Sequence, residues 1–166
     1  MEWRMSYAPI LTIWSVMLGL IWGPGAAADP LLTKAQIAKA ATRIEACLAK
    51  QSKSANAKPA ACIGLIKSKC DGQISAGGEA AHATCSDNET AAWDVLLNKK
   101  WAELSANMEE KRFAALKAVQ KLWLSYRDAK CAFLETDETS MMGYMNAADC
   151  RMDETSRRVL ELREIE

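Results

Sequence analysis

Gln120-Lys-Leu-Trp-Leu-Ser-Tyr-Arg-Asp-Ala-Lys-Cys131 gathers aromatic, ionic and thiol groups on what we expect to be a single helix. Trp123 and Arg127 lie four residues apart, so they share one face of that helix. Asp128 is placed to meet a cation on a neighbouring helix, and the thiol of Cys131 can bond covalently to another part of the chain. The stretch therefore predicts a helix that is held in place by packing, ionic contacts and a disulfide.

Apolar side chains recur at helical spacing on both sides of this stretch. Together with cap residues and breaks, they predict five helices, over residues 31–51, 60–69, 86–107, 108–134 and 153–166. A Ser86-x-x-Glu89 capping box should start the third helix, after a Gly-rich loop over residues 71–84. The third and fourth helices should pair as a long antiparallel hairpin with aromatic side chains between them. The prediction is an all-α, disulfide-linked bundle.

Six cysteines follow the first 28 residues, and an even number in an exported chain predicts three disulfides. Other pairings stay open, but we favour neighbours in sequence, because each bond would then join the end of one helix to the start of the next. The expected bonds are Cys47–Cys62, Cys70–Cys85 and Cys131–Cys150. A metal site is the weaker alternative, since the chain has one histidine, His82, and no Cys-x-x-Cys motif. We therefore expect no metal and no cofactor.

The first 28 residues have the pattern of a signal peptide. Arg4 supplies a positive charge, an apolar segment runs from Ala8 to Trp22, and small residues precede Asp29. The apolar segment is short for a membrane span, which takes about 20 residues. We expect cleavage after Ala28, with an uncleaved anchor as the weaker alternative. The mature protein is then periplasmic or secreted and has no stable membrane anchor.

The mature chain, residues 29–166, carries as many Lys and Arg as Asp and Glu residues. A zero net charge argues against nucleic acid and against a polybasic membrane contact. We expect one packed unit with two parts. Residues 29–84 form an N-terminal helical hairpin and the Gly-rich loop, and residues 85–166 form a helical domain.

Catalysis is disfavoured, because the sequence lacks a recognisable set of nucleophile, base and orienting group. His82 is expected in the Gly-rich loop, and no serine lies in a Gly-x-Ser-x-Gly motif. An enzyme that uses Arg127 and Asp128 is retained as a remote hypothesis. A set of polar residues is expected to form a buried network that fixes the register of the helix hairpin, with a ligand pocket as the less favoured interpretation. The set is Asp94, Asn98, Gln120, Arg127 and Asp128.

The segment over residues 135–149 is expected to be a loop clamped by Cys131 and Cys150. It begins with acidic residues and continues with apolar ones that are enriched at protein interfaces. A clamped loop is ordered before binding, which lowers the cost of association. We therefore predict a partner-binding surface here, against the alternative that the methionines fold back onto the core. Its residues are Glu135, Asp137, Glu138, Met141, Met142 and Tyr144.

Three ordered motifs resemble the LprI-like lysozyme inhibitor domain family. They are Cys85-x3-Glu89-x4-Asp94-x2-Leu97-Asn98, Gln120-x2-Trp123-x2-Tyr126-Arg127-Asp128-x2-Cys131 and Cys150-x4-Thr155-x-Arg157-x2-Leu160. The resemblance extends from Cys85 to Leu162. The motif residues taken as structural are Glu89, Asp94, Asn98, Gln120, Trp123, Tyr126, Arg127, Asp128, Thr155 and Arg157. Cys62-Ile-Gly64 to Cys70, followed by Gly77-Gly78, is similar to a subgroup with an additional N-terminal disulfide region.

The resemblance implies a small, helical, exported protein that binds and blocks a lysozyme-like muramidase. One departure is Met141-Met142-Gly143-Tyr144, where the family often has a turn similar to Gly-Gly-Ser. An acidic rim of Glu135, Asp137, Glu138, Asp149, Asp153 and Glu154 would suit a basic enzyme. The alternative is a periplasmic binding or scaffolding module that inhibits nothing and has another partner.

Overall fold

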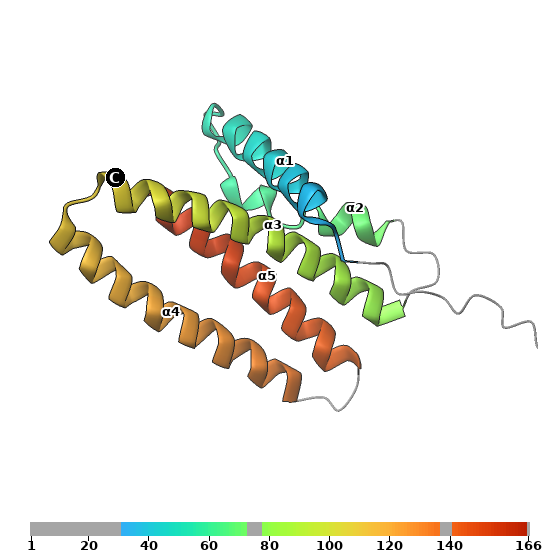
Figure 1. The fold of residues 1–166 in the computed structure, drawn as a ribbon. Coiled ribbons are helices and arrows are strands. Elements are labelled where there is room, and N and C mark those ends of the chain that lie inside the picture. The colour runs from blue at the N-terminus through green and yellow to red at the C-terminus, as the bar shows by residue number, and fades with distance from the viewer. Residues whose placement is uncertain (1–30, 73–77, 137–140, 166) are drawn as a thin grey trace, which may run out of the picture.

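The computed structural model describes residues 31–72, 78–136 and 141–165 (Figure 1). The expected signal peptide, residues 1–28, lies outside these ranges. Within them, every regular element is helical, which confirms the all-α class. The elements are α1 (Lys34–Ser52), the 3-10 helix η1 (Pro59–Cys62), α2 (Lys67–Asp71), α3 (Gly78–Asn107), α4 (Glu110–Thr136) and α5 (Met141–Arg163). None of these helices is long and apolar enough to cross a bilayer.

The three long helices α3, α4 and α5 run up, down and up (Figure 1). A short turn joins α3 to α4, and beside it the rings of Trp101 and Phe113 lie 5.0 Å apart. The two helices are antiparallel and joined as expected, but they do not pack along their length. Instead α5 packs against both of them, and most extensively against α3. On its other side α3 carries α1, so that Trp93 and Ile44 are buried in one core.

α1 follows the sequence prediction closely. Thr33 caps its start, and the side chain of Gln36 returns a hydrogen bond to the backbone N–H of Thr33 at 2.9 Å. Ala40, Ile44 and Leu48 are buried along one stripe, because residues three or four apart share a helix face. The stripe faces α3, and the small alanine allows the two helices to approach closely.

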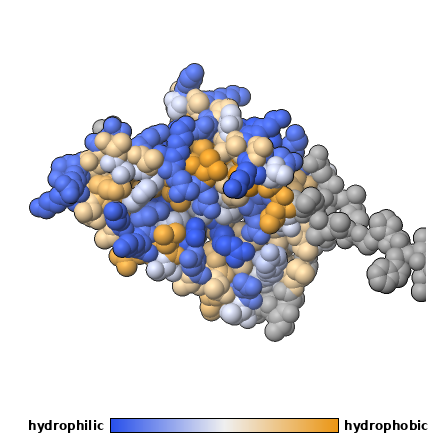
Figure 2. Space-filling model, viewed as in Figure 1, coloured by the Kyte–Doolittle hydropathy of each residue, from blue (hydrophilic) through white to orange (hydrophobic). Residues whose placement is uncertain are grey.

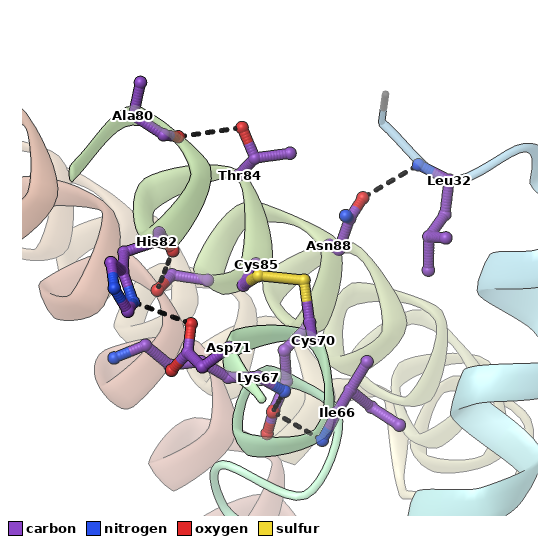
Figure 3. Close-up of a disulfide and its surroundings, with 12 residues drawn as sticks. Leu32, Ile66, Lys67, Cys70, Asp71, Ala80, His82, Thr84, Cys85 and Asn88 are labelled. Atoms are coloured by element: carbon purple, nitrogen blue, oxygen red, sulfur yellow. Dashed lines mark hydrogen bonds and ion pairs between the residues drawn. A yellow bond between two sulfur atoms is a disulfide. The ribbon is translucent and has the colours of Figure 1, made fainter. Parts of the chain in front are cut away.

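All three expected disulfides are present, and no cysteine is left free. Cys47–Cys62 joins α1 to η1, and Cys131–Cys150 joins α4 to α5. Cys70–Cys85 joins α2 to α3 (Figure 3). Each bond links an element to one of its neighbours in the fold.

The start of α3 differs from the prediction. α3 begins at Gly78, so residues 78–84 are helical and the capping box is wrong: Ser86 and Glu89 lie inside the helix. The alanines taken for a loop, Ala81 and Ala83, are fully buried, and small side chains of high helix propensity suit such close packing. A domain boundary at 84/85 would fall within α3.

The single helix expected over residues 60–69 is divided into η1 and α2. Gly64 lies between them with φ of 84°, a left-handed conformation that glycine adopts without steric cost. The turn at Gly64 redirects the chain before Lys67, where α2 begins.

The predicted loop over residues 135–149 is wrong. Glu135 lies in the last turn of α4, and α5 begins at Met141 instead of Asp153. Asp137 and Glu138 lie outside the described residues. Buried small residues at helical spacing explain the early start of α5, because they allow it to pack closely against its neighbours. They are Gly143, Ala147, Ala148 and Cys150.

Candidate functional site

The described members of the predicted partner-binding set lie near the tip of the α4–α5 hairpin, on helix ends instead of a loop. Met141 and Tyr144 lie one turn apart on α5, with exposed fractions of 46% and 41%. Glu135 is exposed on α4, whereas Met142 is half-buried. The prediction missed Phe133, which is 67% exposed on α4. Its only signal in the sequence is that it falls outside the apolar stripe of its helix.

The base of this tip is held firmly. The buried Cys131–Cys150 disulfide joins the two helices, and an ion pair between Lys130 and Glu154 at 2.5 Å adds a second link. Both links lie within about four turns of the tip residues. The helix ends are therefore presented in one fixed arrangement.

A groove of about 340 Å³ lies between α3 and α4. Four of the five residues in the predicted polar set line it, whereas Asp128 is exposed and does not. The lining residues are Asp94, Leu97, Asn98, Trp101, Gln120, Leu124 and Arg127. Residues of the first two sequence motifs thus line one groove.

Arg127 connects α4 to α5. Its Nη1 donates to Thr155 Oγ1 at 3.3 Å, while its Nε donates to Asp128 Oδ1 at 3.0 Å. The guanidinium also lies 5.1 Å from the ring centre of Trp123, a distance suited to a cation–π contact. Tyr126, one residue away, is exposed, and the centre of its ring lies 5.7 Å from Lys130 Nζ.

A second arginine completes this arrangement and was not singled out from the sequence. Arg158 is buried on α5, donates from Nε to Gln120 Oε1 at 2.8 Å, and lies 5.7 Å from the ring centre of Trp123. The motif residue Arg157 is exposed and pairs with Asp153 on its own helix at 2.7 Å. The sequence signal that could have identified Arg158 is its helical spacing, because it lies three residues after Thr155, which is also buried on α5.

Asp94, which lines this groove, has a shifted pKa. Burial raises the pKa of its carboxyl above the ordinary 3.8, and the positive charge of Arg127 lowers it in part. Within the described residues, the Asp94 side chain forms no hydrogen bond or ion pair. It is therefore a half-buried carboxyl group with unused acceptors.

Glu89 is fully buried and has a structural role that the capping box did not anticipate. Its Oε1 accepts hydrogen bonds from Gly64 N at 2.7 Å and from Trp93 Nε1 at 2.9 Å. Its Oε2 accepts from Ile66 N at 2.9 Å and from Lys67 N at 2.7 Å. The carboxylate therefore caps the start of α2 from the side of α3, a role that sequence spacing cannot show.

A larger groove, about 840 Å³, lies where α1, α2 and α3 meet. Figure 3 shows its disulfide edge, where Leu32 N donates to Asn88 Oδ1 at 2.8 Å beside Cys70–Cys85. On the face of the molecule seen in Figure 2, apolar patches alternate with hydrophilic ones. The cations that line this larger groove, Lys39, Arg43 and Lys69, are all exposed.

His82 does not lie in a loop, contrary to the prediction. It belongs to α3, and its Nδ1 lies 2.9 Å from Asp71 Oδ1 of α2 (Figure 3). The pair adds a polar link beside the Cys70–Cys85 bond. Among the described residues, no group of His, Cys, Asp and Glu is arranged to hold a metal ion.

Comparison with known families gives one match. A family model described as "Lysozyme inhibitor LprI" matches residues 70–162, which is more than half of the chain. The match spans the Cys70–Cys85 and Cys131–Cys150 bonds and all three motifs, and it confirms the resemblance. Residues before Cys70, with the first disulfide, lie outside it, so the N-terminal subgroup stays a prediction. No curated protein and no solved structure matches the chain.

Proposed function

We propose that this chain, which belongs to the LprI lysozyme inhibitor family, binds and blocks a lysozyme-like muramidase through the tip of its α4–α5 hairpin. The observation that carries the proposal is the exposure of Phe133, Met141 and Tyr144 at one disulfide-clamped end. The described part of the chain does not cover Asp137 and Glu138, which complete the proposed surface.

The physical basis is that large apolar and aromatic side chains supply most of the binding energy at protein interfaces. Aromatic residues that are already held by regular helices lose little conformational freedom on binding. Phe133 and Tyr144 meet both conditions, because each lies on a helix and the two helices are cross-linked.

Fewer acidic residues are available to a basic partner than the sequence alone indicated. Three members of the expected acidic rim have cationic partners: Asp149 with Lys67, Asp153 with Arg157, and Glu154 with Lys130. The remaining acidic group is Glu135, Asp137 and Glu138. Complementary charge of this kind mainly raises the rate of association with a basic enzyme.

The location of the protein follows from the same proposal. Three disulfides and membership of an inhibitor family suit an extracellular or periplasmic compartment. We propose that residues 1–28 direct export and are removed after Ala28. A muramidase of that compartment is then the partner.

The test adds the mature protein, residues 29–166, to c-type, g-type and i-type lysozymes and follows the clearing of a cell-wall suspension. Against a sensitive enzyme, Phe133→Ala and Tyr144→Ala should each weaken inhibition by about tenfold or more. Leu122→Ala is the matched control, because Leu122 is 72% exposed on α4 but lies about 16 Å along the helix from Phe133. It should leave inhibition unchanged.

Reversing the charge of Glu135, Asp137 and Glu138 to lysine should slow association and reduce its dependence on salt. Unchanged inhibition in the two aromatic variants would show that the tip is not the binding surface. A protein that blocks none of the three enzymes would instead support a binding module with another partner.

A further inference from the structure

The α3 wall of the groove between α3 and α4 holds polar side chains whose hydrogen-bonding capacity is unused. Asp94 and Asn98 lie four residues apart on α3, so both face the groove. Neither side chain forms a hydrogen bond or ion pair within the part of the chain that the structure describes. Asp94 offers acceptors only, whereas the amide of Asn98 offers both donors and acceptors.

The α4 wall supplies donors. Arg158 is donor-only, so its bond fixes the oxygen of the Gln120 amide towards α5 and leaves the NH₂ group free to donate. Arg127 uses Nε and one N–H of each terminal nitrogen on Asp128 and Thr155. Each terminal nitrogen of Arg127 carries a second N–H. The groove therefore has donors on the α4 wall, and a carboxylate acceptor and an amide on the α3 wall.

The space between Asp94 and Arg127 indicates which chemical group fits. The two side chains line the groove from opposite helices, yet they do not form an ion pair with each other. A group between them has to accept from the guanidinium and donate to the carboxylate at the same time. A hydroxyl group does both.

The remaining lining is apolar and uncharged. Leu97, Leu124 and the partly exposed Trp101 offer C–H and ring surfaces, and Trp101 is held by its contact with Phe113. The charge of Arg127 is already paired with Asp128, and Asp94 would repel an anion, so the lining suits a neutral ligand that binds through hydrogen bonds. The groove volume of about 340 Å³ lies within the range of small-ligand sites.

We propose that this groove binds a neutral saccharide. A pyranose ring presents hydroxyl groups at its edge and C–H groups on its face, which matches the polar walls and the apolar lining. The proposal does not depend on muramidase inhibition, because it uses a different surface from the hairpin tip.

The test titrates the isotope-labelled mature protein with chitotriose and, separately, with cellotriose at millimolar concentration, and follows it by NMR without any muramidase. Binding should shift the side-chain amide signals of Asn98 and Gln120 and the indole N–H signal of Trp101. A stronger response to chitotriose than to cellotriose would extend the proposal to the acetamido group, and equal responses would support recognition of the ring hydroxyls.

Two variants locate the site. Asn98→Ala should weaken binding by about tenfold, because one hydrogen-bonding side chain is lost. Leu124→Trp should abolish binding by filling the groove, whereas Ala118→Trp on the exposed face of α4 should retain it. The proposal is overturned if neither saccharide shifts these signals, or if Leu124→Trp binds as the unmodified protein does.

Discussion

Replacing Glu89 with glutamine tests how a buried carboxylate holds α2 against α3. Glutamine has nearly the same shape, but its NH₂ group cannot accept a hydrogen bond. If the NH₂ group faces α2, the backbone N–H groups of Ile66 and Lys67 lose their acceptor. If it faces the other way, Gly64 N–H and Trp93 Nε1–H lose theirs. Either orientation leaves two donors without a partner.

The expected cost follows from these two donors. Each buried donor that loses its acceptor costs about 1–3 kcal/mol, so Glu89→Gln should lower the free energy of unfolding by about 4 kcal/mol. Small domains have about 5–15 kcal/mol in total, so the change is a large fraction of the stability. At about 3 °C per kcal/mol for a domain of this size, the melting temperature should fall by roughly 12 °C.

The assay is urea denaturation at neutral pH with the disulfides intact, followed by far-ultraviolet circular dichroism and tryptophan fluorescence. Glu103→Gln is the matched control, because Glu103 lies on the same helix but is exposed, 4.0 Å from Lys100. It should change stability by less than about 0.5 kcal/mol. A loss below about 1 kcal/mol in Glu89→Gln would refute the capping role assigned to this carboxylate.

Two further predictions concern the disulfide and the titration in the groove. Replacing both Cys131 and Cys150 with serine removes a bond that closes 19 residues, and should lower the free energy of unfolding by about 3 kcal/mol in urea titrations. Burial raises the pKa of Asp94 despite the opposing charge of Arg127, so the folded state holds this proton more tightly than the unfolded state. The destabilisation from ionising Asp94 should therefore be full at neutral pH and decline as the pH falls through the folded pKa towards 3.8. Asp94→Asn should remove this dependence, so its stability gain over the unmodified protein should shrink on acidification; a constant difference from pH 7 to pH 4 would contradict the assignment.

Strong local patterns made part of the fold predictable. Thr33 with Gln36 marks the start of α1, and the stripe through Ile44 and Leu48 marks its buried face. Cysteine pairing was predictable as well, because a short separation joins neighbours in a helical chain. These features depend on residues near one another in the sequence, so no knowledge of tertiary contacts was needed.

The starts of α3 and α5 were missed because small residues occur both in loops and at closely packed positions of helices. Gly143 and Ala147 look like loop residues in the sequence, but in the structure they are buried positions of a closely packed helix. Glycine has low helix propensity, so the helical state of Gly143 depends on tertiary packing, whereas alanine favours a helix and Ala147 was assigned to the loop with its neighbours. The loop assigned to residues 135–149 failed for this reason.

The polar set was only partly predictable from the sequence. The motif residues were identified, but their partners were not, because Arg158 and Thr155 lie on a helix that is distant in sequence. The network was expected to fix the register of the α3–α4 hairpin. Its hydrogen bonds instead run from Gln120 and Arg127 on α4 to α5.

The direction of these hydrogen bonds distinguishes the groove residues that have a structural role from those that are available to a ligand. A network that fixed α3 against α4 would pair Asp94 and Asn98 with side chains of α4, yet both are unpaired among the described residues. The hydrogen bonds of Gln120 and Arg127 to α5 are sufficient to orient the α4 wall. Structural need thus accounts for the α4 residues. On α3, the half-buried Asp94 and the exposed Asn98 keep hydrogen-bonding capacity that solvent, or a ligand in the groove, would meet.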